Sequence, residues 1–184
     1  GDEPHQYPKL ILDEAEHFAR RGQWTMLAER LTLVDGLFED WPEKMAPLTL
    51  DAERLRALQF SHRGALEDAT RALERAIAAA GSSLFERADL VRVQGQYGEL
   101  MVRRGRFGEA SIACEAAIEF TERYLADTHP DLVGPYLCLV DVEEAQGNLP
   151  AANAALERAQ EVVAGPDCSS RLKTRVRARS AQLP

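Results

Sequence analysis

The chain has 184 residues, of which 45% are hydrophobic and 28% charged, and its formal net charge is −8 at pH 7. This composition is that of an ordinary globular protein, and the negative charge argues against a general affinity for nucleic acid. No apolar run is long enough to span a membrane, and no signal peptide is visible. Because the first residue is Gly1 and not methionine, we expect the chain to be part of a longer protein.

The three cysteines, Cys114, Cys138 and Cys168, form no CxxC pair. Cys114 and Cys138 fall within helical apolar patterns, where a free cysteine packs as a small hydrophobic side chain. An odd number of cysteines without a paired motif favours a reducing setting. We therefore expect reduced thiols and a cytoplasmic protein.

Apolar residues recur every three or four positions along most of the chain, which predicts amphipathic helices. A short N-terminal tail, residues 1–7, is expected to be disordered. Pro42 and Pro47 interrupt the helical pattern. The predicted helix pairs, each with a glycine at its turn, cover 8–41 (Gly22), 48–81 (Gly64), 84–126 (Gly105) and 129–165 (Gly147).

Local signals mark several helix ends. Gly81 is expected to cap the end of the second pair, and Ser83 with Glu86 forms a capping box for the third. Residues 128–131 read Thr-His-Pro-Asp, and proline is favoured in the first turn of a helix. They predict the start of the fourth pair, which ends at Gly165.

A last amphipathic stretch, about 169–181, has no partner helix and is expected to cap the fold within a segment that covers 166–184. It carries five basic residues against Asp167, a net charge of +4. Their spacing of two spreads the charges around a helix, which favours a solvated cap; a surface for nucleic acid or an anionic partner is the alternative. The basic residues are Arg171, Lys173, Arg175, Arg177 and Arg179.

The turn glycines lie 42, 41 and 42 residues apart, which marks an internal repeat. A period of this length is typical of stacked helical units. No segment shows the sustained alternation of a strand. We therefore predict an all-α protein, an α-solenoid of about four antiparallel helix pairs with a C-terminal capping helix. An apolar residue follows each glycine two positions later: Trp24, Leu66, Phe107 and Leu149.

These residues resemble the tetratricopeptide (TPR) family. Its pattern has a large–small pair, a turn glycine, an aromatic residue, and small residues at helix crossings, where a large side chain would push the helices apart. The period exceeds the usual 34 residues of TPR units and resembles the long-helix variety of kinesin light chains and many bacterial regulators. HEAT and armadillo repeats share the longer period, but the large–small pair favours TPR. The clearest unit contains Tyr97, Gly98, Met101, Gly105, Phe107, Ala110 and Ala117.

The resemblance implies that the first helix of each pair lines a groove that binds a peptide or a partner helix. Arginine can hold a carboxylate through two parallel hydrogen bonds, which favours an acidic or C-terminal peptide. The lysine/asparagine clamp of chaperone-binding TPR proteins is absent, since Leu12, Glu16, Arg54 and Leu58 stand at its positions. The peptide site is predicted at Arg54, Leu58, His62, Arg92, Gln96, Glu99, Arg103 and Asp141. The same surface is expected to include Leu12, Ala19, Gly95, Leu137 and Cys138.

No residue pattern indicates catalysis. None of the histidines has metal-ligand spacing, and no Walker, GxGxxG or GxSxG motif occurs. We expect no catalytic residue, no metal and no cofactor. We predict a non-catalytic protein-interaction module, a scaffold or adaptor that binds a protein or peptide partner. The alternatives are a sensory domain of a larger signalling or transcription regulator, and a module that dimerises through Trp24, Phe38 and Trp41.

Overall fold

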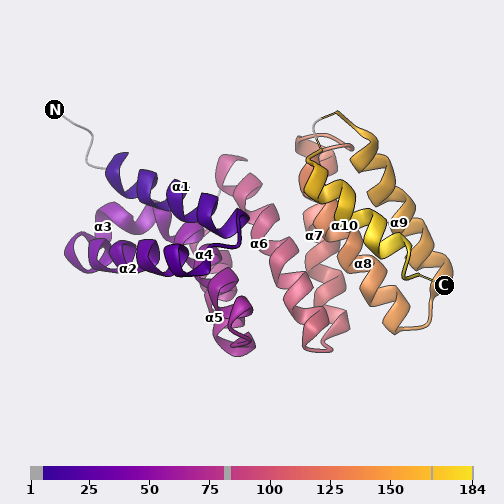
Figure 1. The fold of residues 1–184 in the computed structure, drawn as a ribbon, viewed down its shortest axis with the longest axis horizontal. Helices are drawn as coiled ribbons and strands as arrows, with labels where there is room; N and C mark the ends of the chain where they lie inside the picture. The colour runs from indigo at the N-terminus through magenta and orange to yellow at the C-terminus, as the bar shows by residue number, and fades with distance from the viewer. Residues whose placement is uncertain (1–5, 81–83, 167, 184) are drawn as a thin grey trace. The chain divides into compact units, whose positions relative to one another are not determined.

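The computed structural model describes residues 6–80, 84–166 and 168–183, in which all regular secondary structure is helical (Figure 1). The chain divides into two compact units, Gly1–Asp89 and Leu90–Pro184, and each is described by itself. Among the helices of the described residues, none is long and apolar enough to cross a membrane.

Unit 1 contains two antiparallel helix pairs, in which α1 packs against α2 and α4 packs against α5. The interruption predicted at Pro42 and Pro47 contains two short helical pieces, α3 and the 3₁₀ helix η1. The helices of this unit are α1 (Gln6–Arg20), α2 (Trp24–Asp40), α3 (Pro42–Met45), η1 (Ala46–Leu48), α4 (Thr49–His62) and α5 (Leu66–Ala79).

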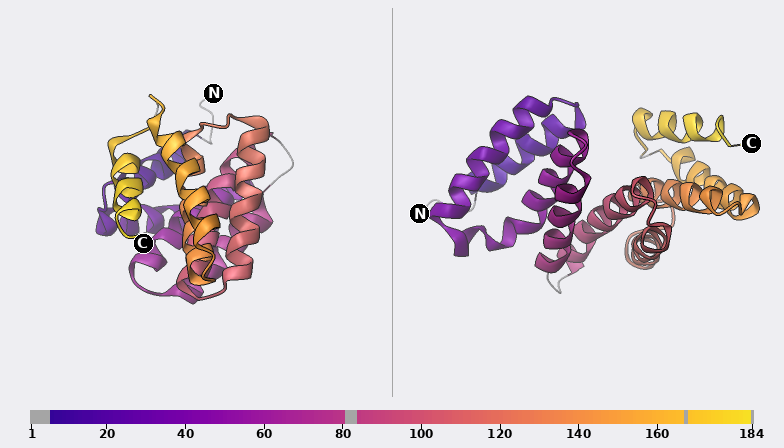
Figure 2. Two further views of the ribbon diagram at one scale, coloured as in Figure 1. Left: turned by 90° about the vertical axis from the view of Figure 1, so that its right-hand side faces the viewer. Right: turned by 90° about the horizontal axis from the view of Figure 1, so that it is seen from below.

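Helix α6 (Leu84–Arg103) starts before the boundary and continues into unit 2. There it pairs with α7, and α8 pairs with α9. The final helix, α10, lies beside α9 and also contacts α8 (Figure 2). The other helices of this unit are α7 (Phe107–Tyr124), η2 (Pro130–Leu132), α8 (Val133–Ala145), α9 (Leu149–Ala164) and α10 (Ser170–Ser180).

The four glycines of the repeat occupy equivalent turns. Their φ angles are +69° at Gly22, +77° at Gly64, +72° at Gly105 and +77° at Gly147, in the left-handed region that glycine enters without a steric cost. In each turn the following residue donates its N–H to the carbonyl five positions earlier, as at Gln23 and Phe18 (2.9 Å). This 6→1 bond is that of a Schellman motif. The predicted hairpin turns are confirmed.

The small residues predicted at helix crossings are buried. In the first pair Leu27 and Val34 replace them and are buried as well, at 0% exposure. Each unit has its own apolar core, which includes Leu31 in unit 1 and Leu156 in unit 2. An all-α fold of sequential antiparallel helix pairs with a C-terminal helix is therefore confirmed. The crossing residues with 0% exposure are Ala69, Ala76, Ala110, Ala117, Ala152 and Ala159.

Several predicted helix ends can be compared with the structure. Nδ1 of His129 accepts the N–H of Asp131 at 3.3 Å, as expected for a helix start. Gly165 caps α9. Tyr7, placed in the predicted tail, is the second residue of α1. Residues 1–5, the Gly81 cap and the Ser83 end of the capping box lie outside the described residues.

Candidate functional site

One face of α6 carries four of the predicted site residues, all within unit 2. Arg92, Gln96, Glu99 and Arg103 follow one another at intervals of four, three and four positions, which places them on one stripe of the helix. We call these four residues the α6 stripe. Arg103 is exposed and stands in the last turn of α6.

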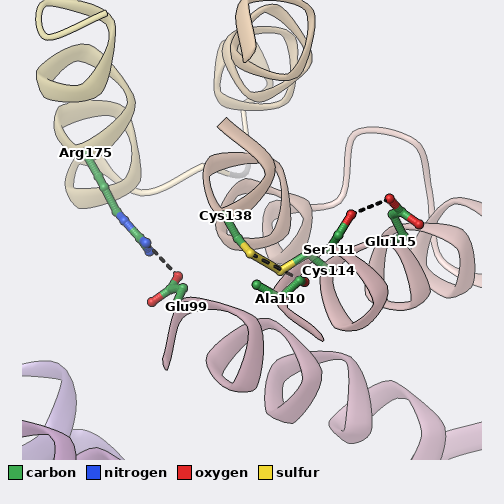
Figure 3. Close-up of a disulfide and its surroundings, with 7 residues drawn as sticks. All are labelled: Glu99, Ala110, Ser111, Cys114, Glu115, Cys138 and Arg175. Atoms are coloured by element: carbon green, nitrogen blue, oxygen red, sulfur yellow. Dashed lines mark hydrogen bonds and ion pairs between the residues drawn. A yellow bond between two sulfur atoms is a disulfide. The ribbon is translucent and has the colours of Figure 1, made fainter. Parts of the chain in front are cut away.

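Two residues of the α6 stripe form ion pairs with later elements of unit 2. Nε of Arg92 lies 3.1 Å from Oδ2 of Asp131 in η2. Nη2 of Arg175 in α10 lies 2.6 Å from Oε1 of Glu99 (Figure 3). The side chains of Arg92 and Glu99 are 43% and 38% exposed, so solvent screens both pairs and their net energies are small.

Gln96 differs from its neighbours on the stripe because it has a buried polar atom without a hydrogen bond in the described part of the chain. Its side-chain oxygen is buried and has no hydrogen-bond partner among the described residues. A buried polar atom without a partner costs about 1–3 kcal/mol. The unpaired oxygen of Gln96 therefore lowers the stability of unit 2.

Asp141 also forms an ion pair with α10. Nε of Arg179 donates to its Oδ1 at 2.8 Å, and Nη2 of the same arginine donates to Glu144. Burial alone would lower the pKa of Arg179, but the hydrogen bonds to Glu144 and Asp141 outweigh it and raise the pKa. The expectation of a solvated cap is therefore wrong for Arg179, whose side chain is 14% exposed, but not for Arg175, at 44%. Both arginines pair with acidic residues of unit 2. They are four positions apart and share a helix face directed at α6 and α8.

In unit 1 the predicted cation Arg54 is buried, with 5% of its surface exposed. Its Nη2 donates to Oε2 of Glu16 on α1. Glu16 also accepts from Nε of Arg20 at 2.8 Å. The Arg54 side chain thus joins the first helices of the two pairs of unit 1, and it is not a surface cation.

The other two site residues of unit 1 lie near the ends of its helices. Leu58 is partly buried and packs against the core. His62 is exposed and stacks on Trp24, with ring centroids 4.3 Å apart and an interplanar angle of 12°. Phe38 also packs on that core, whereas Trp41 is 49% exposed. Trp24 and Phe38 of the predicted dimer surface therefore have partners inside unit 1.

Five residues expected on the same surface are buried, and those predictions are wrong. Helical spacing identifies which residues share a face, but it does not say whether solvent or the next helix covers that face. Gly95 packs against Pro135, because a Cβ added at Gly95 would lie 3.5 Å from the proline ring. The buried residues are Leu12, Ala19, Gly95, Leu137 and Cys138.

A carboxylate recurs at the same position in three of the helix pairs, which sequence reasoning missed. Glu16, Glu99 and Asp141 each lie six positions before a turn glycine, and each pairs with an arginine of a later first helix or of α10. Two of the pairs, Glu16–Arg54 and Asp141–Arg179, span 38 positions. The signal was an acidic residue and an arginine separated by slightly less than one repeat.

The Glu16–Arg54 pair predicts a pH dependence of stability. Burial raises the pKa of Glu16, but the charge of Arg54 and hydrogen bonds from Arg54 and Arg20 outweigh it, so the pKa lies below 4.5. Because the folded pKa is the lower one, this stabilisation is present above pH 4.5 and is lost as pH falls through the folded pKa. Glu16→Gln should lose about 1.5 kcal/mol in urea unfolding at pH 6, and the loss should shrink at pH 3. The exposed Glu29→Gln should show neither effect, and an equal loss from Glu16→Gln at both pH values would contradict the assignment.

Cys114 of α7 and Cys138 of α8 form a disulfide (Figure 3). Their Cα atoms are 6.6 Å apart and both residues are buried. The expectation of reduced thiols is wrong for this pair and holds for Cys168, which is buried and in no disulfide. Since disulfides persist mainly in oxidising settings, the cysteines do not support a reducing compartment.

No group of His, Cys, Asp and Glu side chains that could hold a metal ion occurs in the described part of the chain. The candidate site therefore consists of charged and polar side chains on the first helices of the pairs.

The sequential antiparallel helix pairs give the chain the architecture of a helical-repeat protein. No model of a known protein family matches its sequence, and a search of curated proteins finds no match.

Proposed function

We propose that this chain is a non-catalytic protein-interaction module of the tetratricopeptide type, which binds a peptide or partner helix along the α6 stripe. The observation that carries the proposal is the stripe itself. Arg92, Gln96, Glu99 and Arg103 place hydrogen-bonding side chains at one-turn intervals on a single helix. Unit 2 has its own buried apolar core.

The existing ion pairs of this surface are compatible with exchange for the charges of a partner. Arg92, Glu99 and Asp141 have side chains that are 43%, 38% and 42% exposed. Exposed pairs contribute at most about 1 kcal/mol each, so a partner that supplies replacement charges displaces them at little cost.

The proposal is tested with arrayed 12-residue peptides against the immobilised full chain. The variant Arg92→Glu/Arg103→Glu should weaken the selected peptides about tenfold, because each charge-assisted hydrogen bond contributes about 1.5–3 kcal/mol when desolvated and less at an exposed position. Circular dichroism should show unchanged helicity. Arg54 is a poor target, since its burial makes charge reversal destabilising.

The matched control is Arg123→Glu, an exposed arginine on α7. It makes the same change of charge away from the α6 stripe and should leave binding unchanged. The proposal is wrong if the array yields no peptide that saturates, or if Arg92→Glu/Arg103→Glu binds the selected peptides as tightly as Arg123→Glu does.

A further inference from the structure

Helix α10 takes the place of a first helix in unit 2. It contacts α8 and α9 as α4 contacts α1 and α2 in unit 1. An equivalent carboxylate–arginine pair is present in both arrangements, because Glu16–Arg54 and Asp141–Arg179 each span 38 positions. Residues at matching positions along the two seams, between α2 and α4 and between α9 and α10, can therefore be compared.

In unit 1 large apolar side chains fill the seam between α2 and α4. Met45 and Leu55 are each 1% exposed, and the smaller Ala52 is 0% exposed. Phe38 and Leu48 pack against the same core. Such packing leaves no room for a further side chain.

In unit 2 the matching positions carry smaller or polar side chains, while Leu172 and Val176 of α10 pack against the core. Counted from the ion pairs, Val163 stands in the place of Phe38, and Arg177 in the place of Ala52. An open groove of about 550 Å³ results between α9 and α10. Its lining includes Gln160, Val163, Ala164, Lys173, Val176 and Arg177. Likewise, Ser170 stands in the place of Met45, Lys173 in that of Leu48, and Ser180 in that of Leu55.

The charge of the groove is positive. Lys173 and Arg177 line it one helical turn apart, and among the described residues no acidic side chain lines it. Arg175 and Arg179 lie on another face of α10, where they pair with Glu99, Asp141 and Glu144. The groove thus combines apolar lining residues with two cations that form no ion pair with the described residues of unit 2.

We propose that this groove is the docking site of an acidic helical segment of a partner protein. The segment places a large apolar side chain against Val163 and the exposed Ala164, where unit 1 has Phe38. Its carboxylates lie against Lys173 and Arg177. Large apolar anchors in a pocket with complementary charges at the rim are typical of protein interfaces. This surface is separate from the α6 stripe, so the inference goes beyond the proposed function.

The test uses a fluorescein-labelled peptide with the sequence of residues 35–48, which has large apolar side chains and an excess of acidic residues. Fluorescence anisotropy with the full chain should show saturable binding. Val163→Phe restores the missing bulk and should weaken binding at least tenfold without lowering the melting temperature. Ala164→Met fills the groove from an exposed position and should act in the same direction. Lys173→Glu/Arg177→Glu should also weaken binding at least tenfold.

The controls distinguish docking in this groove from binding elsewhere on the chain. A peptide in which alanine replaces the residues equivalent to Phe38 and Met45 should not bind, and Arg123→Glu should bind as the unchanged chain does. Arg92→Glu/Arg103→Glu should also bind this peptide normally, which separates this inference from the function proposed for the α6 stripe. Single-stranded DNA and vesicles of anionic lipid serve as further probes.

Three outcomes overturn the inference. The first is the absence of saturable binding at about millimolar concentration, the weakest affinity of interest here. The second is loss of binding with Lys173→Glu/Arg177→Glu but not with Val163→Phe or Ala164→Met, which indicates a general anionic surface. The third is tighter binding of DNA or vesicles than of the peptide.

Discussion

Replacing both cysteines of the disulfide, with Cys114→Ala/Cys138→Ala, should lower the free energy of unfolding by about 3 kcal/mol. The bond closes a loop between residues 24 positions apart, and its loss restores conformational freedom to the unfolded chain. For a chain of this length, such a loss lowers the melting temperature by about 10 °C. Urea unfolding monitored by circular dichroism measures the effect.

Reduction provides an independent version of the same measurement. The unchanged chain in excess reductant should approach the stability of the double variant, whose own stability should not respond to reductant. Cys168→Ala is the matched control, because it removes a buried cysteine that is in no disulfide. It should cost about 1 kcal/mol, the contribution of a small buried side chain. Three reactive thiols in the denatured, unreduced chain, in place of one, would contradict the disulfide.

The scaffold was predictable from sequence because its rules are local. A positive φ at Gly22 and its equivalents needs only the residue type and the end of an apolar pattern. Ala110 and Ala117 were recognisable because the repeat placed small residues at the same positions in several units. These features depend on spacing along the chain, and spacing is what a sequence displays.

The burial of Arg54 was not predictable in the same way. An arginine on a first helix suggests an exposed cation, but the neighbouring helix brings Glu16 against it and covers both. Whether a helix face meets solvent or another helix depends on the rotation of the packed pair. The spacing of residues along a single helix gives no information about that rotation.

The disulfide was hidden for a related reason. Cys114 and Cys138 occupy apolar positions of two different helices, and an odd number of cysteines suggested free thiols. The bond depends on the 6.6 Å separation of their Cα atoms, which the packing of α7 on α8 sets. The pairing of Arg179 was easier to predict from sequence. The interval of 38 positions between Asp141 and Arg179 repeats the interval between Glu16 and Arg54.

Gly98→Ala should destabilise unit 2 by about 2 kcal/mol or more, as overpacking of a close contact does. A Cβ at this position would overlap Sγ of Cys114 and lie 3.0 Å from Sγ of Cys138 and 3.3 Å from the carbonyl oxygen of Ala110. Glycine at this point of α6 therefore lets α7 and the disulfide approach the helix backbone. Denaturant unfolding measures the loss, and thiol titration should show weaker formation of the disulfide.

Gly36→Ala is the matched control, because Gly36 lies inside α2 and a Cβ there meets nothing within 4 Å. Alanine is the better helix former, so this variant should gain about 1 kcal/mol. The same substitution thus has opposite signs at two helical glycines, which separates contact from propensity. In the Cys114→Ala/Cys138→Ala background both sulfur atoms are gone, and the penalty at Gly98 should fall to the strain against Ala110 alone. An undiminished penalty in that background would show that the sulfur atoms do not set the contact, because residues in direct contact should couple.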